Sequence, residues 1–248
     1  SVVNTKALEL ADGVNVTIGS ETNKNILNEE NLASVALGGG ASLNTTSGDL
    51  SALTSVALAT GTADDRTTWT HSSGIAVNGD VSVGNDASID AAGAVSVDGS
   101  VSVGNRSDIT AESIDFGDAN LKIGGTATLT SETGDVTLGG VDGLDEGVLA
   151  TATVNSAKDI VFAAESESSL HLKAAGDIVV NENVSVTLSQ GEIDAKDTTL
   201  KDGSTFELLG NNNVLGGTTG TPEENPYVLS EVTLGNGATL VIGGNNPA

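Results

Sequence analysis

Paired carboxylates are the chemistry that this chain could most readily offer, because 34 of its 248 residues are Asp or Glu. A glycosidase needs two carboxyl groups at a set separation, one of them held as the acid. Three close pairs stand out in the sequence: Asp64-Asp65, Asp142/Asp145 and Glu165/Glu167. In so acidic a chain such pairs are inevitable, and solvated charges on an exposed surface explain each of them. We therefore assign no catalytic residue.

The residue types that serve metal and thiol chemistry are scarce. The chain has no Cys, which excludes a disulfide framework, a thiol nucleophile and Cys-ligated metals. His71 and His171 show no metal-ligand spacing. Residues 139–145 resemble a nonapeptide calcium turn, but Asp142 stands where that motif has Gly and the motif occurs once. We predict no metal and no cofactor.

Ligand contact is the remaining role for the rare side chains. Trp69 and Tyr227 are the only Trp and Tyr of the chain, and such rings are favoured at binding hot spots. With the nearby His71 they form our candidate ligand-contact set, placed in loops. The alternative for Trp69 is that it packs beneath its own loop.

The charge balance limits the partners. Nine Lys and Arg against 34 Asp and Glu give a formal net charge of −25 at pH 7. Nucleic acid and anionic membranes are bound through clustered basic residues, so we predict neither as a partner. No run approaches the roughly 18 apolar residues of a membrane helix, so we expect no membrane insertion by this segment.

Internal repeats indicate the elements that must position these residues. Val81-Ser82-Val83-Gly84-Asn85 recurs 20 residues later at 101–105, and a similar phrase follows at 121–125. Other echoes are 21 residues apart (34–37 and 55–58) or 18 apart (159–162 and 177–180). Self-similarity at a fixed period is the sequence signature of a solenoid.

Within each repeat, apolar and polar residues alternate, as in Val81-Ser82-Val83, and Gly or Asn follows. This pattern predicts short half-buried strands joined by tight corners. We therefore expect an all-β fold, a single-stranded right-handed parallel β-helix with about 18–21 residues per coil. The alternative is a left-handed β-helix, because five apolar residues are spaced by six from Val77 to Val101.

We expect one solenoid domain over residues 1–248. Three polar stretches interrupt the repeats and are predicted to be loops that leave the solenoid: 20–31, 60–74 and 211–231. Residues 1–15 lack the basic start and apolar core of a signal peptide, and we expect this sequence to begin after processing.

The repeats resemble a known kind of exoprotein. The phrase L-x-x-G-A/S-T-L at 234–240 and, with Phe in its last position, at 200–206, together with Ala174–Val180, is similar to passenger domains of autotransporters and to filamentous-haemagglutinin-type exoproteins. The resemblance implies a non-enzymatic adhesin with roles in cell adhesion and virulence, secreted or held at the bacterial cell surface through an outer-membrane anchor outside this sequence. Its partners would be host or bacterial surface proteins or glycans.

The alternative function is a polysaccharide-active lyase or glycosidase, because some right-handed β-helices are such enzymes. A lyase would need a basic catalytic residue, and the two arginines, Arg66 and Arg106, lie in no recognisable motif. Assays for depolymerase activity distinguish the two functions.

Overall fold

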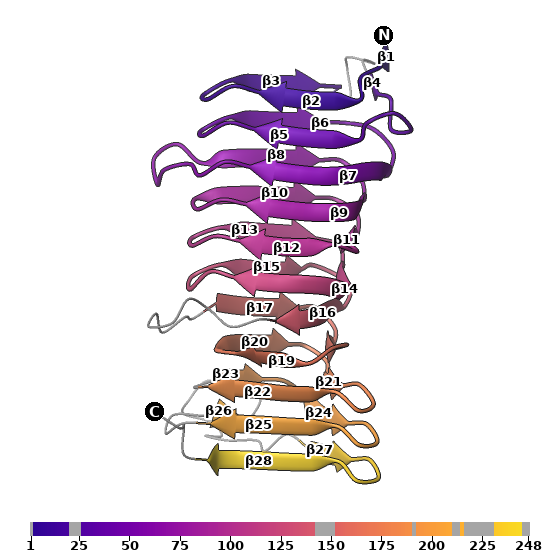
Figure 1. The fold of residues 1–248 in the computed structure, drawn as a ribbon, viewed down its shortest axis with the longest axis vertical. Helices are drawn as coiled ribbons and strands as arrows, with labels where there is room; N and C mark the ends of the chain where they lie inside the picture. The colour runs from indigo at the N-terminus through magenta and orange to yellow at the C-terminus, as the bar shows by residue number, and fades with distance from the viewer. Residues whose placement is uncertain are drawn as a thin grey trace.

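The computed structural model describes residues 2–19, 26–141, 152–189, 192–209, 214–215 and 231–244. These residues contain strands, turns and bends, and no helix. The strands form a tall stack whose successive turns lie on one another (Figure 1). Every strand pair is parallel, an arrangement consistent with a β-solenoid.

Three main sheets and one short pair run along the stack. The short pair, sheet A, consists of β1 (Val2–Val3) and β4 (Ile26–Leu27). Sheet B has twelve strands: β2 (Ala7–Leu10), β5 (Ser34–Leu37), β7 (Leu50–Leu58), β9 (Ile75–Val83), β11 (Val95–Val97), β12 (Ser100–Val103), β14 (Ile114–Ile123), β16 (Val136–Val141), β18 (Ile160–Phe162), β21 (Ile178–Val180), β24 (Asp197–Leu200) and β27 (Glu231–Leu234).

The other two sheets cover the remaining faces. Sheet C has ten strands: β3 (Asn15–Ile18), β6 (Ser42–Thr45), β8 (Thr67–His71), β10 (Ala87–Ala91), β13 (Asp108–Ala111), β15 (Thr128–Ser131), β17 (Ala152–Ser156), β20 (Leu170–Ala174), β23 (Glu192–Asp194) and β26 (Val214–Leu215). Sheet D has four: β19 (Ser166–Ser168), β22 (Ser185–Ser189), β25 (Thr205–Leu209) and β28 (Thr239–Gly244).

The strand register follows the repeats. Val103 pairs with Val83 on one side and with Ile123 on the other. Ser34–Leu37 pairs with residues 55–58, and Ile160 pairs with Ile178. The pairing predicted from the repeats is therefore confirmed at these positions.

Some register steps are longer than the repeats. Thr128 pairs with Thr153, Ser42 with Thr68 and Asp197 with Glu231. In the step from Ser42 to Thr68, the described connection 59–66 between β7 and β8 accommodates extra residues.

Alternation explains the interior. Inward residues such as Val83, Val103 and Ile123 are at most 5% exposed, while Ser82, Ser102 and Lys122 between them point outward. The buried apolar side chains form one cluster that extends from Leu8 to Leu208. This cluster gives the stack its hydrophobic core.

Of the three expected loops, the described residues cover only 60–74 in full. Residues 59–66 connect β7 to β8, but Thr67–His71 is a strand, β8, with inward side chains, so assigning all of 60–74 to a loop is wrong. The prediction failed because the side chains of this segment alternate in burial, as in the other strands. Thr67, Trp69 and His71 are buried, and the two threonines between them are more exposed. Of 20–31 and 211–231, only residues 26–31, 214–215 and 231 are described, and 26–27, 214–215 and 231 belong to strands.

Candidate functional site

The structure places the predicted ligand-contact residues differently from our expectation. Trp69 and His71 lie on β8 with 0% and 1% of their surface exposed, so neither is available to a ligand at the surface. Tyr227 lies outside the described residues. The Trp69 ring instead packs in the core, so it is buried as the alternative interpretation held, but it lies on a strand and not beneath a loop.

A hydrogen-bond chain connects these two buried side chains. The Trp69 Nε1–H donates to Thr45 Oγ1 (3.0 Å), and Thr45 Oγ1 lies 2.9 Å from His71 Nδ1. His71 Nε2 lies 3.2 Å from the carbonyl oxygen of Gly48. Burial lowers the pKa of His71, against the opposing pull of these hydrogen bonds and of the Asp49 and Glu29 carboxylates.

A shallow groove follows the corner where sheet C strands end and sheet B strands begin. One depression, about 530 Å³, is lined by Asp49, by Ser and Gly at 72–74 and by Ala-Gly-Ala at 92–94. The next, about 390 Å³, is lined by Asp115, Asp135 and Lys158. Glu112 borders both depressions, so we treat them as one surface, the corner groove.

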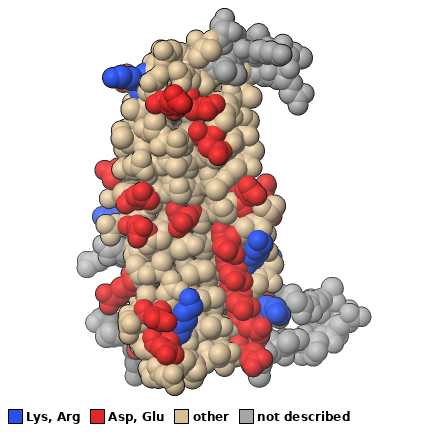
Figure 2. Space-filling model, turned by 90° about the vertical axis from the view of Figure 1, so that its right-hand side faces the viewer, with Lys and Arg blue, Asp and Glu red and all other residues tan. Residues whose placement is uncertain are grey.

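The corner groove is acidic and built by the fold itself. Asp49 accepts hydrogen bonds from Ser73 Oγ (2.5 Å) and the Gly74 N–H (2.9 Å), which hold the pKa of Asp49 below its usual value. Asp135 Oδ1 likewise accepts the N–H of Asp159 one turn further along (3.1 Å). These carboxylates therefore satisfy backbone groups at sharp corners and still present negative charge to solvent. Figure 2 shows acidic side chains lined up along the stack on this side of the molecule.

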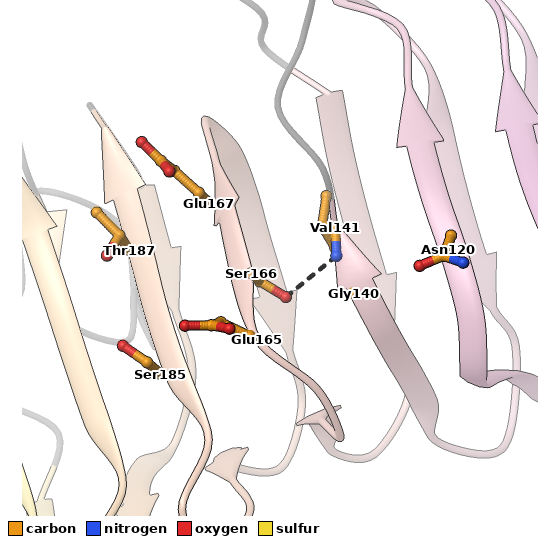
Figure 3. Close-up of a pocket in the computed structure, with 8 residues that line it drawn as sticks. All are labelled: Asn120, Gly140, Val141, Glu165, Ser166, Glu167, Ser185 and Thr187. Carbon is orange, nitrogen blue, oxygen red and sulfur yellow. Dashed lines mark hydrogen bonds between the residues drawn. The ribbon is translucent and has the colours of Figure 1, made fainter.

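A second groove lies where sheet D begins beside the end of β16 (Figure 3). It has a volume of about 330 Å³ and is lined by Asn120, Gly140, Val141, Glu165, Ser166, Glu167, Ser185 and Thr187. The Val141 N–H donates to Ser166 Oγ (3.3 Å), which takes the place of a backbone ladder bond between β16 and β19. Glu167 lies on the outer face of β19 and Glu165 directly precedes that strand. Glu165 extends toward the strand that carries Ser185.

The acidic pairs differ in what surrounds them. Glu165 and Glu167 are both exposed, whereas an acid catalyst needs burial to stay protonated near neutral pH. Asp64 and Asp65 are also exposed and lie in the connection before β8. Asp142 and Asp145, with the rest of the calcium-turn segment after Val141, lie outside the described residues. Within the described ranges, no His, Asp and Glu side chains form a group of three that could hold a metal ion.

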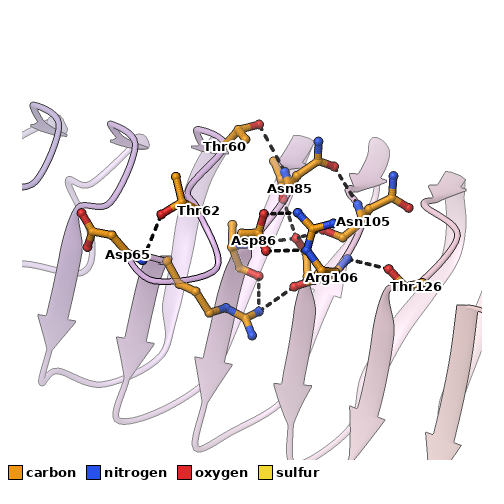
Figure 4. Close-up of polar contacts among 12 residues, drawn as sticks. Thr60, Thr62, Asp65, Asn85, Asp86, Asn105, Arg106 and Thr126 are labelled. Atoms are coloured by element: carbon orange, nitrogen blue, oxygen red, sulfur yellow. Dashed lines mark hydrogen bonds and ion pairs between the residues drawn. The ribbon is translucent and has the colours of Figure 1, made fainter.

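The two arginines lie at the opposite end of the sheet C strands, because Arg66 directly precedes β8 and Arg106 lies two residues before β13. Figure 4 shows Arg106 at this corner. Arg66 Nη2 donates to the carbonyl oxygens of Ala87 (3.1 Å) and Arg106 (2.9 Å) and pairs with Asp108 (2.6 Å). Arg106 pairs with Asp86 of the preceding turn. Both arginines thus hold successive turns together, a structural role.

Comparison with known proteins gives no further guide: no family model, curated protein or solved structure matches the chain. The part of the chain that the structure describes contains no helix long and apolar enough to cross a membrane.

Sequence reasoning missed the corner groove. Its signal was the recurrence of Gly, Ser or Ala after successive sheet C strands, at 47–49, 72–74, 92–94, 112–113 and 132–135, with Asp or Glu added at 47–49, 112–113 and 132–135. Those residues read as turn formers, and only the stacking of turns brings them onto one line.

Proposed function

We propose that this chain is a non-enzymatic, adhesin-like β-solenoid that attaches to ligands on host or neighbouring bacterial cells. The observation that carries the proposal is the corner groove, an open polar surface that continues from Asp49 to Lys158 across successive turns. A surface of this shape suits an extended polar ligand, either a glycan chain or a stretch of polypeptide, that is contacted at every turn.

The charge of the groove limits the classes of ligand that can bind there. Asp49, Glu112, Asp115 and Asp135 face one cation, Lys158, among the lining charges. Electrostatic complementarity favours neutral or positively charged ligands and disfavours anionic polymers such as nucleic acid.

The proposed location is the bacterial cell surface or the extracellular space. Support comes from the absence of Cys, the net charge of −25 and the resemblance of the repeats to exported passenger domains. We also propose that the solenoid is right-handed, because crossovers between parallel strands are right-handed in nearly all proteins. An experimental crystal structure would test the handedness.

A polysaccharide-active enzyme is the second candidate, favoured by one feature. Glu165 directly precedes β19, Glu167 lies within it, and both border the groove of Figure 3. If this groove is a catalytic site, purified protein should depolymerise a glycan, and Glu165→Gln or Glu167→Gln should abolish the activity.

Binding to arrays of glycans and of immobilised host surface proteins tests the adhesin proposal. We expect Glu112→Arg, at the middle of the corner groove, to weaken binding by at least about tenfold. Asp90→Arg, which makes the same charge change on the exposed face of β10 outside the lining of either depression, is the matched control and should bind like wild type. Equal loss in both variants, or turnover of a bound glycan, would overturn the proposal.

A further inference from the structure

From Thr45 to Ala174, His71 is the one ring in a column of otherwise small side chains. The residues that end the sheet C strands pair from turn to turn, with Thr45 beside His71 and His71 beside Ala91. Further along, Ala111, Ser131, Ser156 and Ala174 occupy the same position. Small residues suit this position because the chain turns sharply just after it, so the imidazole needs a specific explanation.

Hydrogen bonding fixes the protonation state of that ring. The Gly48 carbonyl can only accept, so His71 Nε2 carries a proton and donates to it. Thr45 Oγ1 already accepts the Trp69 N–H and can donate its own proton to His71 Nδ1. Neutral His71 with its proton on Nε2 therefore satisfies every partner in the chain from Trp69 to Gly48.

A second proton disrupts this arrangement. It would sit on Nδ1 and point at Thr45 Oγ1, which must then turn its own hydrogen toward the Thr70 carbonyl, 3.4 Å away. The imidazolium would also carry a full charge at a position that is 1% exposed. Such a charge is tolerated only when water or a counter-ion reaches it.

The segment that contacts the His71 ring also contributes to the lining of the corner groove. Gly48 contacts the ring through its carbonyl, and its N–H donates to Glu29 Oε1 (2.7 Å). The next residue, Asp49, lines the groove. Gly48 and Asp49 thus connect the buried imidazole to the lining of the corner groove.

We propose that protonation of His71 opens the 46–49 corner and so weakens ligand binding at the N-terminal end of the corner groove. The part of this inference that concerns ligand rests on the proposed function, whereas the opening of the corner does not.

The charged groups around the ring set the direction of the response. Asp49 and Glu29 are the carboxylates that act on His71, and both favour its protonated form. Burial outweighs them and lowers the pKa of His71 below its usual value. The stability that the neutral ring contributes is therefore complete above the unfolded-state value of about 6.5 and is lost as the pH falls below it toward the folded-state value.

Trp69 provides the readout, because it is the only Trp of the chain and its ring lies 6.2 Å from the His71 ring. A protonated imidazole at that distance quenches indole fluorescence. We expect wild-type fluorescence to fall reversibly as the pH is lowered through one transition below about 6.5. The transition should disappear in His71→Gln, whose amide can donate to Gly48 and accept from Thr45, and should persist in His171→Gln.

Hydrogen exchange locates the opening and does not depend on any variant folding. The Gly48 amide of the wild-type protein should become less protected across the same pH range, after correction for the intrinsic exchange rate, while amides in β12 stay protected. An unchanged Gly48 protection, or the same fluorescence transition in His71→Gln and wild type, would overturn the inference. If the corner opens but the arrays detect no ligand at any pH, the switch stands and the proposed function fails.

Discussion

Arg106 forms a bidentate ion pair with Asp86 of the preceding turn, with Nε 2.8 Å from Oδ1 and Nη2 2.5 Å from Oδ2. Both residues have a left-handed backbone, with φ of 51° for Asp86 and 56° for Arg106. Asn85 and Asn105 beside them are joined by a backbone contact, since the Asn105 N–H donates to Asn85 Oδ1 (2.7 Å). Figure 4 shows these contacts repeating along one corner.

Asp86→Asn should lower the melting temperature at pH 7, because it removes the ion pair and keeps a residue that tolerates positive φ. The bond from Arg106 holds the pKa of Asp86 below its usual value. The pair therefore stabilises the fold above about pH 3.9, and its contribution is lost as the pH falls through the lower folded-state value. Melting curves should accordingly differ at pH 7 and converge in strong acid. Asp90→Asn, which removes an exposed charge from β10, should melt no lower than wild type.

Val103→Asp should destabilise the fold by several kcal/mol, because an unpaired charge would be buried between Val83 and Ile123. Ser102→Asp, one residue earlier on the exposed face, should cost less than about 1 kcal/mol. Urea unfolding of both variants makes the comparison. Equal midpoints would mean that the inward face of β12 is misassigned.

Ser166→Ala and Ser168→Ala should act in opposite directions. Ser166 accepts the N–H of buried Val141, so its loss should cost about 1–3 kcal/mol. Ser168 Oγ is buried without a hydrogen-bond partner, so removing it should leave stability unchanged or raise it by up to about 1 kcal/mol. Thermal denaturation decides between this result and equal losses, which would show that both hydroxyls are satisfied.

Gly139→Ala and Gly140→Ala form a matched pair of neighbours. A methyl group on Gly139 would collide with the carbonyl oxygens of Ala119 and Phe116, which belong to the backbone and cannot move aside. On Gly140 the nearest atom would be the Glu165 carbonyl oxygen at 3.4 Å, an ordinary contact. We expect Gly139→Ala to lose at least about 2 kcal/mol in denaturant titrations and Gly140→Ala less than about 1 kcal/mol. Similar losses in both would contradict the close packing of turns.

Repetition made the ladders predictable from the sequence. Because a parallel stack pairs equivalent residues, the echo of Val83 at Val103 and Ile123 directly identified strand partners. The echo does not determine the handedness of the solenoid, because right-handed and left-handed solenoids both stack equivalent residues at the same step. Handedness therefore stays a proposal.

The candidate site was less predictable, for two physical reasons. Rarity suggested function for Trp69 and His71, but both side chains are buried, and Thr45 supplies hydrogen bonds that satisfy both rings there. The corner groove joins residues as far apart in sequence as Asp49 and Lys158, and their alignment depends on connection lengths that vary from turn to turn. A local pattern contains neither fact.

The replacement of sheet B by sheet D beside β16 has a mechanical consequence. Among the described turns, sheet ladders join most neighbours, but between β16 and β19 one ladder is interrupted. There Ser166 Oγ bridges the two strands, because it accepts the Val141 N–H and donates to the Gly139 carbonyl oxygen. Tension applied along the stack loads the hydrogen bonds between turns directly. A chain pulled from both ends should first yield at this boundary, so that the segments before and after it stretch as two separate blocks in force spectroscopy.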